Sequence, residues 1–208
     1  MYAPARFAED RPEVLAEAIR TAGLATLVTY GRTGIAATHA PILLDPSCGP
    51  HGTLIGHIAR ANPQWRDPDP GVHALAIFAG PEAYVTPSWY PAKQEHGRVV
   101  PTWNYVAVHA HGPIAFFHDP ERLHDAVRRL TEKQEHSRAA PWAVSDAPAE
   151  YIDGMLKGIV GFALTIARLE GTWKLSQNRD KADRQGVARG LADDGRPEIA
   201  AMIPTGDA

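Results

Sequence analysis

Four short segments of the sequence are rich in side chains that form hydrogen bonds, and three of them add an indole ring. They are residues 57–63 (HIARANP), 84–91 (YVTPSWYP), 100–105 (VPTWNY) and 173–179 (WKLSQNR). Aromatic faces can hold a flat ring, amide groups can read its edge, and arginine or lysine can bind a phosphate. This mixture predicts a site for a large planar ligand with a charged tail.

The first segment has the arrangement of an anion site. Arg60 and Asn62 follow a predicted strand at 53–58 and open a short helical turn at 59–65, where free backbone N–H groups should point outward. Arg60 could add a bidentate contact to a phosphate. The same residues also fit a surface arginine beside a turn-forming Asn-Pro pair, so this segment alone leaves both readings open.

Two other segments have equally ordinary structural readings. An indole such as Trp103 in a β-rich domain is usually part of the core, and an asparagine beside it, here Asn104, often bonds to the backbone. Ser176 or Asn178 could simply cap a helix that follows a strand. A ligand site and a structural role therefore both remain open for these residues.

The elements that must position these groups show no βαβ alternation and no internal repeat. Periodicity and capping residues predict helices at 10–22, 119–135 and 149–157, and one or two terminal helices from about 178. Strands are expected at 24–30, 35–44, 53–58, 72–79, 82–86 and 159–169, with a strand-rich stretch at 99–117. This pattern predicts an α+β fold, an antiparallel barrel with peripheral helices, and 208 residues predict a single domain over 1–208.

Composition narrows the class of protein. The formal net charge of −3 argues against indiscriminate attraction to nucleic acid or anionic lipid. One cysteine, Cys48, allows no intramolecular disulfide, which suits a reducing compartment. No secretory signal and no apolar run of about 20 residues is visible, so we expect a cytoplasmic protein without a membrane span.

Several catalytic motifs are missing from the sequence. There is no GxGxxG, GxxxxGK[ST] or GxSxG pattern, which argues against a Rossmann nucleotide site, a P-loop and a serine hydrolase. The histidine pairs His109/His111 and His39/His57 have no acidic partner at ligand spacing, so we expect no metal site there. A haem ligand among them remains open.

The segments HIARANPQW, AYVTPSWYP, VVPTWNYVAVHAHG, EGTWKLSQNR and DRQGVARGL occur in this order between Met1 and about Ile203. Together they resemble the PaiB-like family of FMN-binding negative transcriptional regulators. The resemblance implies a split β-barrel related to pyridoxamine-phosphate oxidases and flavin reductase-like barrels. It also implies a homodimer with FMN in a groove between the subunits.

The resemblance further implies which residues contact the cofactor. Residues 57–62 look like the phosphate-binding element, and residues 173–179 look like a C-terminal element that a partner subunit brings to the flavin. The implied cofactor-binding residues are Thr38, His39, His57, Arg60, Asn62, Trp103, Asn104, Trp173, Lys174, Ser176, Gln177, Asn178 and Arg179.

Three functions are compatible with this site. The first is a flavin-dependent regulator or redox sensor, and the second is an oxidoreductase that passes electrons from a reduced nicotinamide to a small acceptor. The third is a haem-binding or haem-degrading barrel, with His39, His57 and His109 as candidate ligands. Catalytic residues cannot be assigned, because a flavin itself performs the electron chemistry. The mixed charges of 119–135 give no support for direct DNA contact.

Overall fold

The computed structural model describes residues 1–206 of the chain, which divides into two compact units. The terminal unit comprises 1–15, 79–108 and 170–206, and the central unit comprises 16–78 and 109–169. Strands β6 (Ala74–Val85) and β7 (Thr102–Gly112) pass from one unit into the other. Each unit is described separately below.

The central unit is built from antiparallel strands. One sheet has the order β4 (Ile42–Asp45), β5 (Thr53–Ala59), β9 (Ile159–Thr165) and β8 (Ile114–Phe117). In addition, β2 (Ala25–Gly31) and β3 (Gly34–Ala40) form a hairpin, and β2 also pairs with the first part of β6. Along β2 every second residue is buried from Ala25 to Thr29, as expected for a strand with one face in the core.

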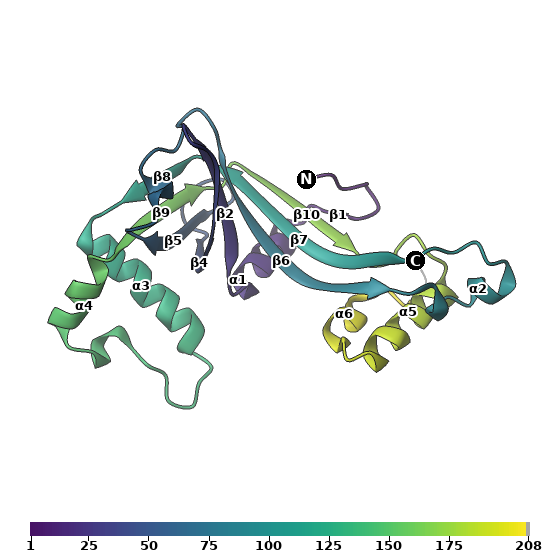
Figure 1. Cartoon of the computed structure of the whole chain (residues 1–208). Helices are drawn as coiled ribbons and strands as arrows, with labels where there is room; N and C mark the ends of the chain where they lie inside the picture. Colours follow the sequence, from purple (N-terminus) through teal and green to yellow (C-terminus); the bar gives the residue numbers. More distant parts are fainter. Residues whose placement is uncertain (207–208) are drawn as a thin grey trace. The chain divides into compact units, whose positions relative to one another are not determined.

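Helix α3 (Pro120–Glu135) lies along the sheet that contains β5 and β9 (Figure 1). Asp119 caps its first turn by accepting a hydrogen bond from the Arg122 backbone, and Pro120 occupies the first helical position. Leu123 packs with Phe117 of β8 and with Leu156 of α4 (Ala149–Leu156), and a 3₁₀ turn at Val144–Asp146 leads into α4. This apolar cluster fixes the helix ends that surround the candidate site.

The terminal unit has the strand order β1 (Ala8–Glu9), β10 (Arg168–Lys174), β7, β6. Helix α1 (Pro12–Thr21) begins in this unit, and the short α2 (Ala92–Glu95) follows a 3₁₀ turn at Pro87–Trp89. Val85 and Val106 share a core with residues of α5 (Lys181–Asp193) and α6 (Pro197–Met202). The two helices therefore cover one face of the strands in this unit (Figure 1).

The predicted fold class is confirmed as an α+β, antiparallel split β-barrel, but three strand boundaries were wrong. The predicted strand 35–44 is two strands, β3 and β4, which belong to different sheets, because Pro41 cannot donate a ladder hydrogen bond. Conversely, 72–79 and 82–86 form one strand, since Gly80 lets the chain pass close to Val106. The strand expected at 159–169 ends at Thr165, and β10 follows.

Helices were predicted more closely. The helices expected at 10–22, 119–135 and 149–157 correspond to α1, α3 and α4, and the terminal helices are α5 and α6. Within residues 1–206, no helix is both long enough and apolar enough to cross a membrane.

Candidate functional site

Two predicted site residues of the central unit, Thr38 and Asn62, are joined in one polar network. Asn62 Nδ2 donates to Thr38 Oγ1 at 2.7 Å, and its Oδ1 accepts from the Gln64 backbone at 2.9 Å. Thr38 donates in turn to Gln64 Oε1 at 2.5 Å. Asn62 thereby caps the 3₁₀ turn Pro63–Trp65 and ties it to β3. Both side chains position the turn that follows β5, whatever ligand contact they also make.

Gln64 was not singled out from the sequence, although it holds this network together. Its side chain is 6% exposed, and its Nε2 donates to the carbonyls of Leu27 and Ala36. A buried amide with all its groups bonded fixes the turn against the β2–β3 hairpin. A glutamine after Asn-Pro gives no sequence signal of burial, so only the fold reveals its role.

Arg60 is held firmly at the end of β5. Its Nε donates to the Lys157 carbonyl at 2.6 Å, and its Nη2 donates to the Ile159 carbonyl at 3.0 Å. Its Nη1 lies 3.3 Å from Nδ1 of His118, whose ring meets the edge of Trp65 at 5.0 Å between centroids. A guanidinium has five N–H groups, so these contacts fix its plane while leaving donors for an anion.

Arg60 lines a hollow of about 320 Å³, here called the basic hollow. Leu123 and Leu156 form its apolar floor. The remaining lining residues are His118, Pro120, Asp153 and Lys157. The sequence pointed to Arg60, but not to His118 or Lys157, because the three lie far apart in the chain.

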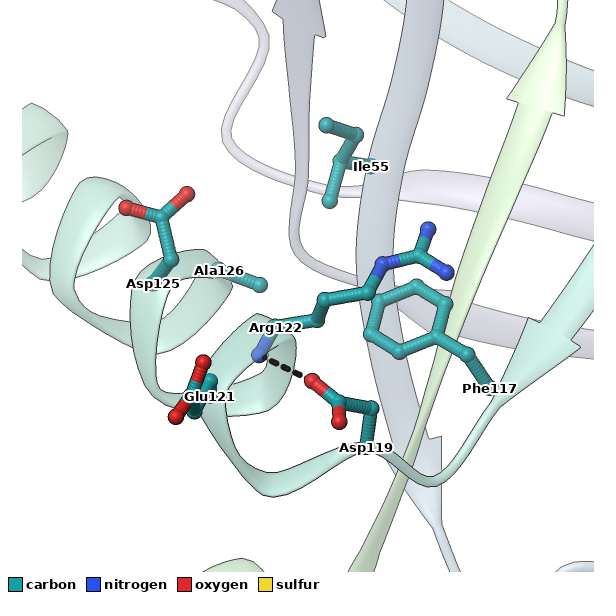
Figure 2. A pocket seen from close by; sticks show the side chains of 7 residues that line it. All are labelled: Ile55, Phe117, Asp119, Glu121, Arg122, Asp125 and Ala126. Atoms are coloured by element: carbon teal, nitrogen blue, oxygen red, sulfur yellow. Dashed lines mark hydrogen bonds between the residues drawn. The ribbon is translucent and has the colours of Figure 1, made fainter.

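A second hollow, of about 310 Å³, is also lined by residues of the first turns of α3 but has a different character (Figure 2). Asp119, Glu121 and Asp125 contribute carboxylates, whereas the cation Arg122 has its guanidinium 4.1 Å from the centre of the Phe117 ring. Three carboxylates against one cation make this acidic hollow a poor site for a phosphate.

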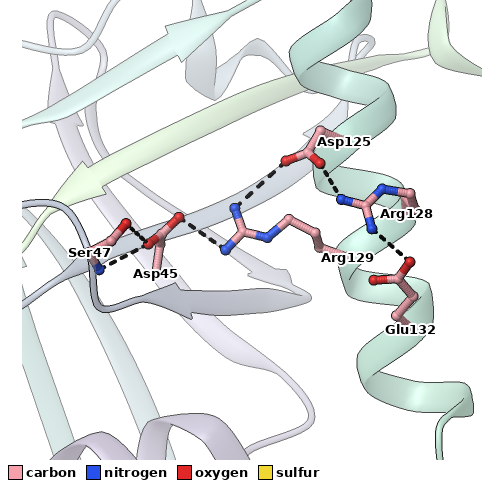
Figure 3. Close-up of polar contacts among 6 residues, drawn as sticks. All are labelled: Asp45, Ser47, Asp125, Arg128, Arg129 and Glu132. Carbon is pink, nitrogen blue, oxygen red and sulfur yellow. Dashed lines mark hydrogen bonds and ion pairs between the residues drawn. The ribbon is translucent and has the colours of Figure 1, made fainter.

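One carboxylate of the acidic hollow also anchors α3. Asp125 pairs with Arg128 at 2.5 Å and faces Arg129 at 3.7 Å, and Arg129 reaches Asp45 of β4 at 3.0 Å (Figure 3). Asp45 also accepts hydrogen bonds from Ser47, and these bonds, with Arg129, lower the pKa of Asp45. This chain of charges belongs to the packing of α3 and leaves less of Asp125 for a ligand.

The two remaining predicted residues of the central unit are histidines with contrasting surroundings. His57 on β5 has a buried Nδ1 without a hydrogen-bond partner in the described part of the chain. Burial lowers the pKa of His57, so its imidazole is neutral at neutral pH. His39 on β3 is exposed, with Nδ1 3.0 Å from Thr26 Oγ1.

In the terminal unit, the neighbours Trp103 and Asn104 point to opposite faces of β7. Asn104 is 0% exposed and its Nδ2 donates to Ser176 Oγ at 3.0 Å, whereas the indole of Trp103 is 51% exposed. The Trp103 ring meets Tyr84 edge-on, with 6.0 Å between ring centres. Trp103 thus offers a ring face, while Asn104 holds the turn after β10.

The turn that follows β10 is unusual in its backbone. Ser176 has a φ of 63°, a left-handed conformation that is uncommon outside glycine. Gln177 satisfies the surrounding backbone, because its side chain accepts from the Leu175 N–H at 2.7 Å and donates to the Trp173 carbonyl. Strain of this kind persists only where surrounding contacts hold it, here Asn104 and Gln177.

The side chains on either side of this turn remain more accessible. Lys174 Nζ donates to Thr102 Oγ1 at 2.7 Å, which leaves two further N–H groups. The guanidinium of Arg179 lies 4.7 Å from the Tyr90 ring, and Asn178 is exposed. Thr102 precedes Trp103 on β7, so the Lys174 ammonium and the Trp103 indole lie on opposite faces of that strand.

These donor sets fit a flavin mononucleotide. Taken separately, the terminal unit has a ring face at Trp103 and a cation at Lys174, and the central unit has the buried His57 Nδ1, which has no hydrogen-bond partner among the described residues. Four other predicted residues, Thr38, Asn62, Asn104 and Ser176, have hydrogen-bond partners within the protein, and their contact with a cofactor stays a prediction.

The chain is similar in sequence to known proteins. Residues 1–168 match the family described as "Putative FMN-binding domain". The chain is 32% identical over 202 residues to protease synthase and sporulation protein PAI 2 of Bacillus subtilis, a match that covers 97% of this chain and 94% of that protein.

Solved structures support the fold alone. The flavocytochrome Anf3 of Azotobacter vinelandii superposes with a TM-score of 0.57 at 10% identity, covering 80% of this chain and 69% of that one. The FAD and heme binding protein of Mycobacterium smegmatis gives 0.56 at 14% identity, covering 80% and 73%.

The fold and the family match define this molecule as a split-barrel flavoprotein whose cofactor is FMN. Within that class, the chain belongs to the PaiB-like family of FMN-binding negative transcriptional regulators, as its motifs predicted.

Proposed function

We propose that this FMN-binding protein is a flavin-dependent regulator or redox sensor that works as a homodimer, with flavin at the subunit interface. The observation that carries the proposal is the exposed Trp103 indole of the terminal unit, which offers a ring face in a chain that matches an FMN-binding domain over residues 1–168. When bound, FMN supplies reversible electron transfer. The surrounding residues need only bind and orient it.

Each accessible group has a distinct task in this proposal. The Trp103 face stacks against the flavin ring, and Lys174, on the other face of β7, neutralises the phosphate of the FMN to which a partner subunit brings residues 173–179, as the family resemblance implies. His57 belongs to the central unit, and burial of its Nδ1 keeps the imidazole neutral, so its contact with a cofactor stays a prediction. The predicted phosphate role of Arg60 stays a second possibility, tested with the basic hollow below.

An open apolar face supports the homodimer. Ile35 of the edge strand β3 is 77% exposed, and its cross-strand partner Tyr30 is 49% exposed. Val28 and Leu75 continue the same face on β2 and β6. Apolar surface at a sheet edge is usually covered by a partner, and a second copy of this chain is the partner that the family resemblance implies.

An FMN-dependent oxidoreductase that uses NAD(P)H is the second candidate. The edge-on pair of Tyr84 and Trp103, both about half exposed, favours it, because such rings can stack a second flat group beside the flavin.

An FMN titration of the purified chain, followed by anaerobic addition of NADPH, tests the proposal. Saturation near one FMN per subunit without bleaching supports the sensor or regulator. Prompt bleaching of the flavin absorbance by NADPH supports the oxidoreductase instead. If FMN does not bind, the cofactor assignment fails, and a haem titration tests the remaining alternative.

A further inference from the structure

We propose that the basic hollow binds a compact organic monoanion with an apolar body, such as an aromatic carboxylate, independently of FMN. The hollow lies wholly within the central unit, where the end of β5 and the ends of α3 and α4 meet. Its volume of about 320 Å³ suits a molecule of roughly benzoate size and is at the small end of ligand pockets.

The floor of the basic hollow selects for apolar surface. Leu123 and Leu156 are 2% and 6% exposed, and Pro120 adds the face of its ring. These residues continue into the apolar cluster around Phe117, so the floor is firmly packed. The transfer of an aromatic ring from water to this floor would cost little free energy. A fully polar group would lose its hydration without gaining a hydrogen-bond partner.

The charges on the wall select for a single negative charge. Arg60 and Lys157 each carry one positive charge, and Asp153 carries one negative charge. The two basic side chains outnumber the one acidic side chain, so these three residues leave an excess of one positive charge, which a monocarboxylate balances. A phosphate ester dianion would leave negative charge uncompensated over an apolar floor, so the hollow is a poor match for the phosphate of FMN.

Arg60 is already arranged for a carboxylate. Its two bonds to the carbonyls of Lys157 and Ile159 fix the guanidinium plane, and N–H groups on Nη1 and Nη2 remain for a ligand. Because the Arg60 guanidinium is held in place before binding, little side-chain entropy is lost when a carboxylate binds. The His118 ring, edge-on to Trp65, adds an aromatic wall.

Binding of three probes to the full-length chain tests the proposal, by calorimetry or ligand-observed NMR, with and without saturating FMN. Benzoate has the proposed chemistry, benzamide has the ring without the charge, and inorganic phosphate has the charge without the ring. We expect benzoate to bind more tightly than either, with a dissociation constant that FMN does not change. Benzoate should also alter the fluorescence of Trp65, assigned with a Trp65→Phe variant.

Two substitutions at the rim of the basic hollow, at Lys157 and Asp153, should change the benzoate affinity in opposite directions. Lys157→Gln should weaken benzoate binding by about two- to fivefold, and Asp153→Asn should strengthen it by a similar factor, the range for exposed charges. Matched controls are Glu150→Gln on the same helix and Lys93→Gln in the terminal unit. All four positions are exposed, so folding should be unaffected.

Several results would overturn the proposal. Absence of benzoate binding would do so, as would benzamide or phosphate binding as tightly as benzoate. Equal benzoate affinities of Lys157→Gln and Asp153→Asn would show that the charges on the wall do not select the ligand. Displacement of benzoate by FMN would assign the hollow to the flavin phosphate, as the sequence predicted for Arg60. Failure of FMN to bind, with benzoate binding intact, would refute the proposed function and leave this inference standing.

Discussion

Polar residues in this chain show why a motif does not by itself identify a ligand contact. Asn62 and Asn104 were both predicted to bind the cofactor, and both donate hydrogen bonds to hydroxyls within the protein. The same amide can bond either to a ligand or to the fold, and the choice depends on which face of the strand it occupies. At β7 that choice leaves Trp103 outward and Asn104 inward.

At the residue scale, Lys174→Gln should weaken FMN binding by about 1–3 kcal/mol, because a charge-assisted hydrogen bond to phosphate is lost. Riboflavin, which lacks the phosphate, should bind the variant and the parent chain equally. Flavin fluorescence titrations with both ligands measure the difference. Lys93→Gln, a lysine elsewhere in the same unit, serves as the control, and an unchanged FMN affinity for Lys174→Gln would refute the phosphate role.

The pKa of His57 predicts a pH effect on stability. Burial lowers the pKa from 6.5, so below that pH the unfolded chain binds a proton more readily than the folded chain. The contribution of His57 is therefore present above pH 6.5 and is lost as the pH falls through the folded-state pKa. We expect His57→Gln to lose less free energy of unfolding than the parent between about pH 7.5 and about pH 5.5.

Urea unfolding at the two pH values makes this comparison, and the exposed His39 supplies a control as His39→Gln. The other histidines are common to all three chains, so their contributions cancel in the difference. If His57→Gln and the parent lose stability in parallel as the pH falls, the buried imidazole is not the cause.

At the scale of elements, the segments YVTPSWYP and DRQGVARGL pack closely against each other. The ring of Trp89, from the segment YVTPSWYP, lies against Gly190 of α5, and the Trp89 carbonyl lies against Gly186 one turn earlier. A Cβ at Gly190 would be 2.3 Å from the ring, and one at Gly186 would be 2.0 Å from the carbonyl oxygen. The segment DRQGVARGL therefore needs its glycines so that α5 can approach the 3₁₀ turn.

Gly190→Ala should lower the free energy of unfolding by about 1–3 kcal/mol, because the added methyl group overpacks a rigid contact. Gly154→Ala in α4 is the matched control, since nothing lies within 4 Å of its added Cβ. There the higher helix propensity of alanine should stabilise the chain by about 0.5–1 kcal/mol. Chemical unfolding measures both, and equal effects would contradict the packing account.

At the scale of the whole molecule, the open face around Ile35 predicts self-association. Ile35→Glu should convert the proposed homodimer to a monomer, because a charge would be buried at the edge of β3. The side chain is 77% exposed in the single chain, so the fold of each subunit should survive. Sedimentation velocity measures the change, with Thr33→Glu in the adjacent turn as control.

If the Ile35→Glu variant remains a dimer, the dimer interface lies elsewhere on the chain. A parent chain that is monomeric at micromolar concentration would refute the dimer itself. If the dimer is lost and FMN binding falls with it, the flavin needs both subunits, as the family resemblance implies.

The sequence alone determined the fold class, the family and every helix of the described chain except the short α2, because these depend on local signals. Asp119 and Pro120 mark the start of α3 through capping and a fixed φ, and both act between neighbours in the chain. The family motifs are also contiguous runs of residues. Strand boundaries at Pro41 and Gly80 were missed, because whether a strand continues depends on the strand beside it.

Only the tertiary structure decided which site residues face one another. Arg60, His118 and Lys157 are separated by 58 and then 39 positions, yet they line one hollow. Gln64 became the centre of a network through two hairpin carbonyls that lie 37 and 28 residues earlier in the chain. Such contacts depend on how strands pair and helices pack, and these long-range contacts produce no periodic pattern in the sequence.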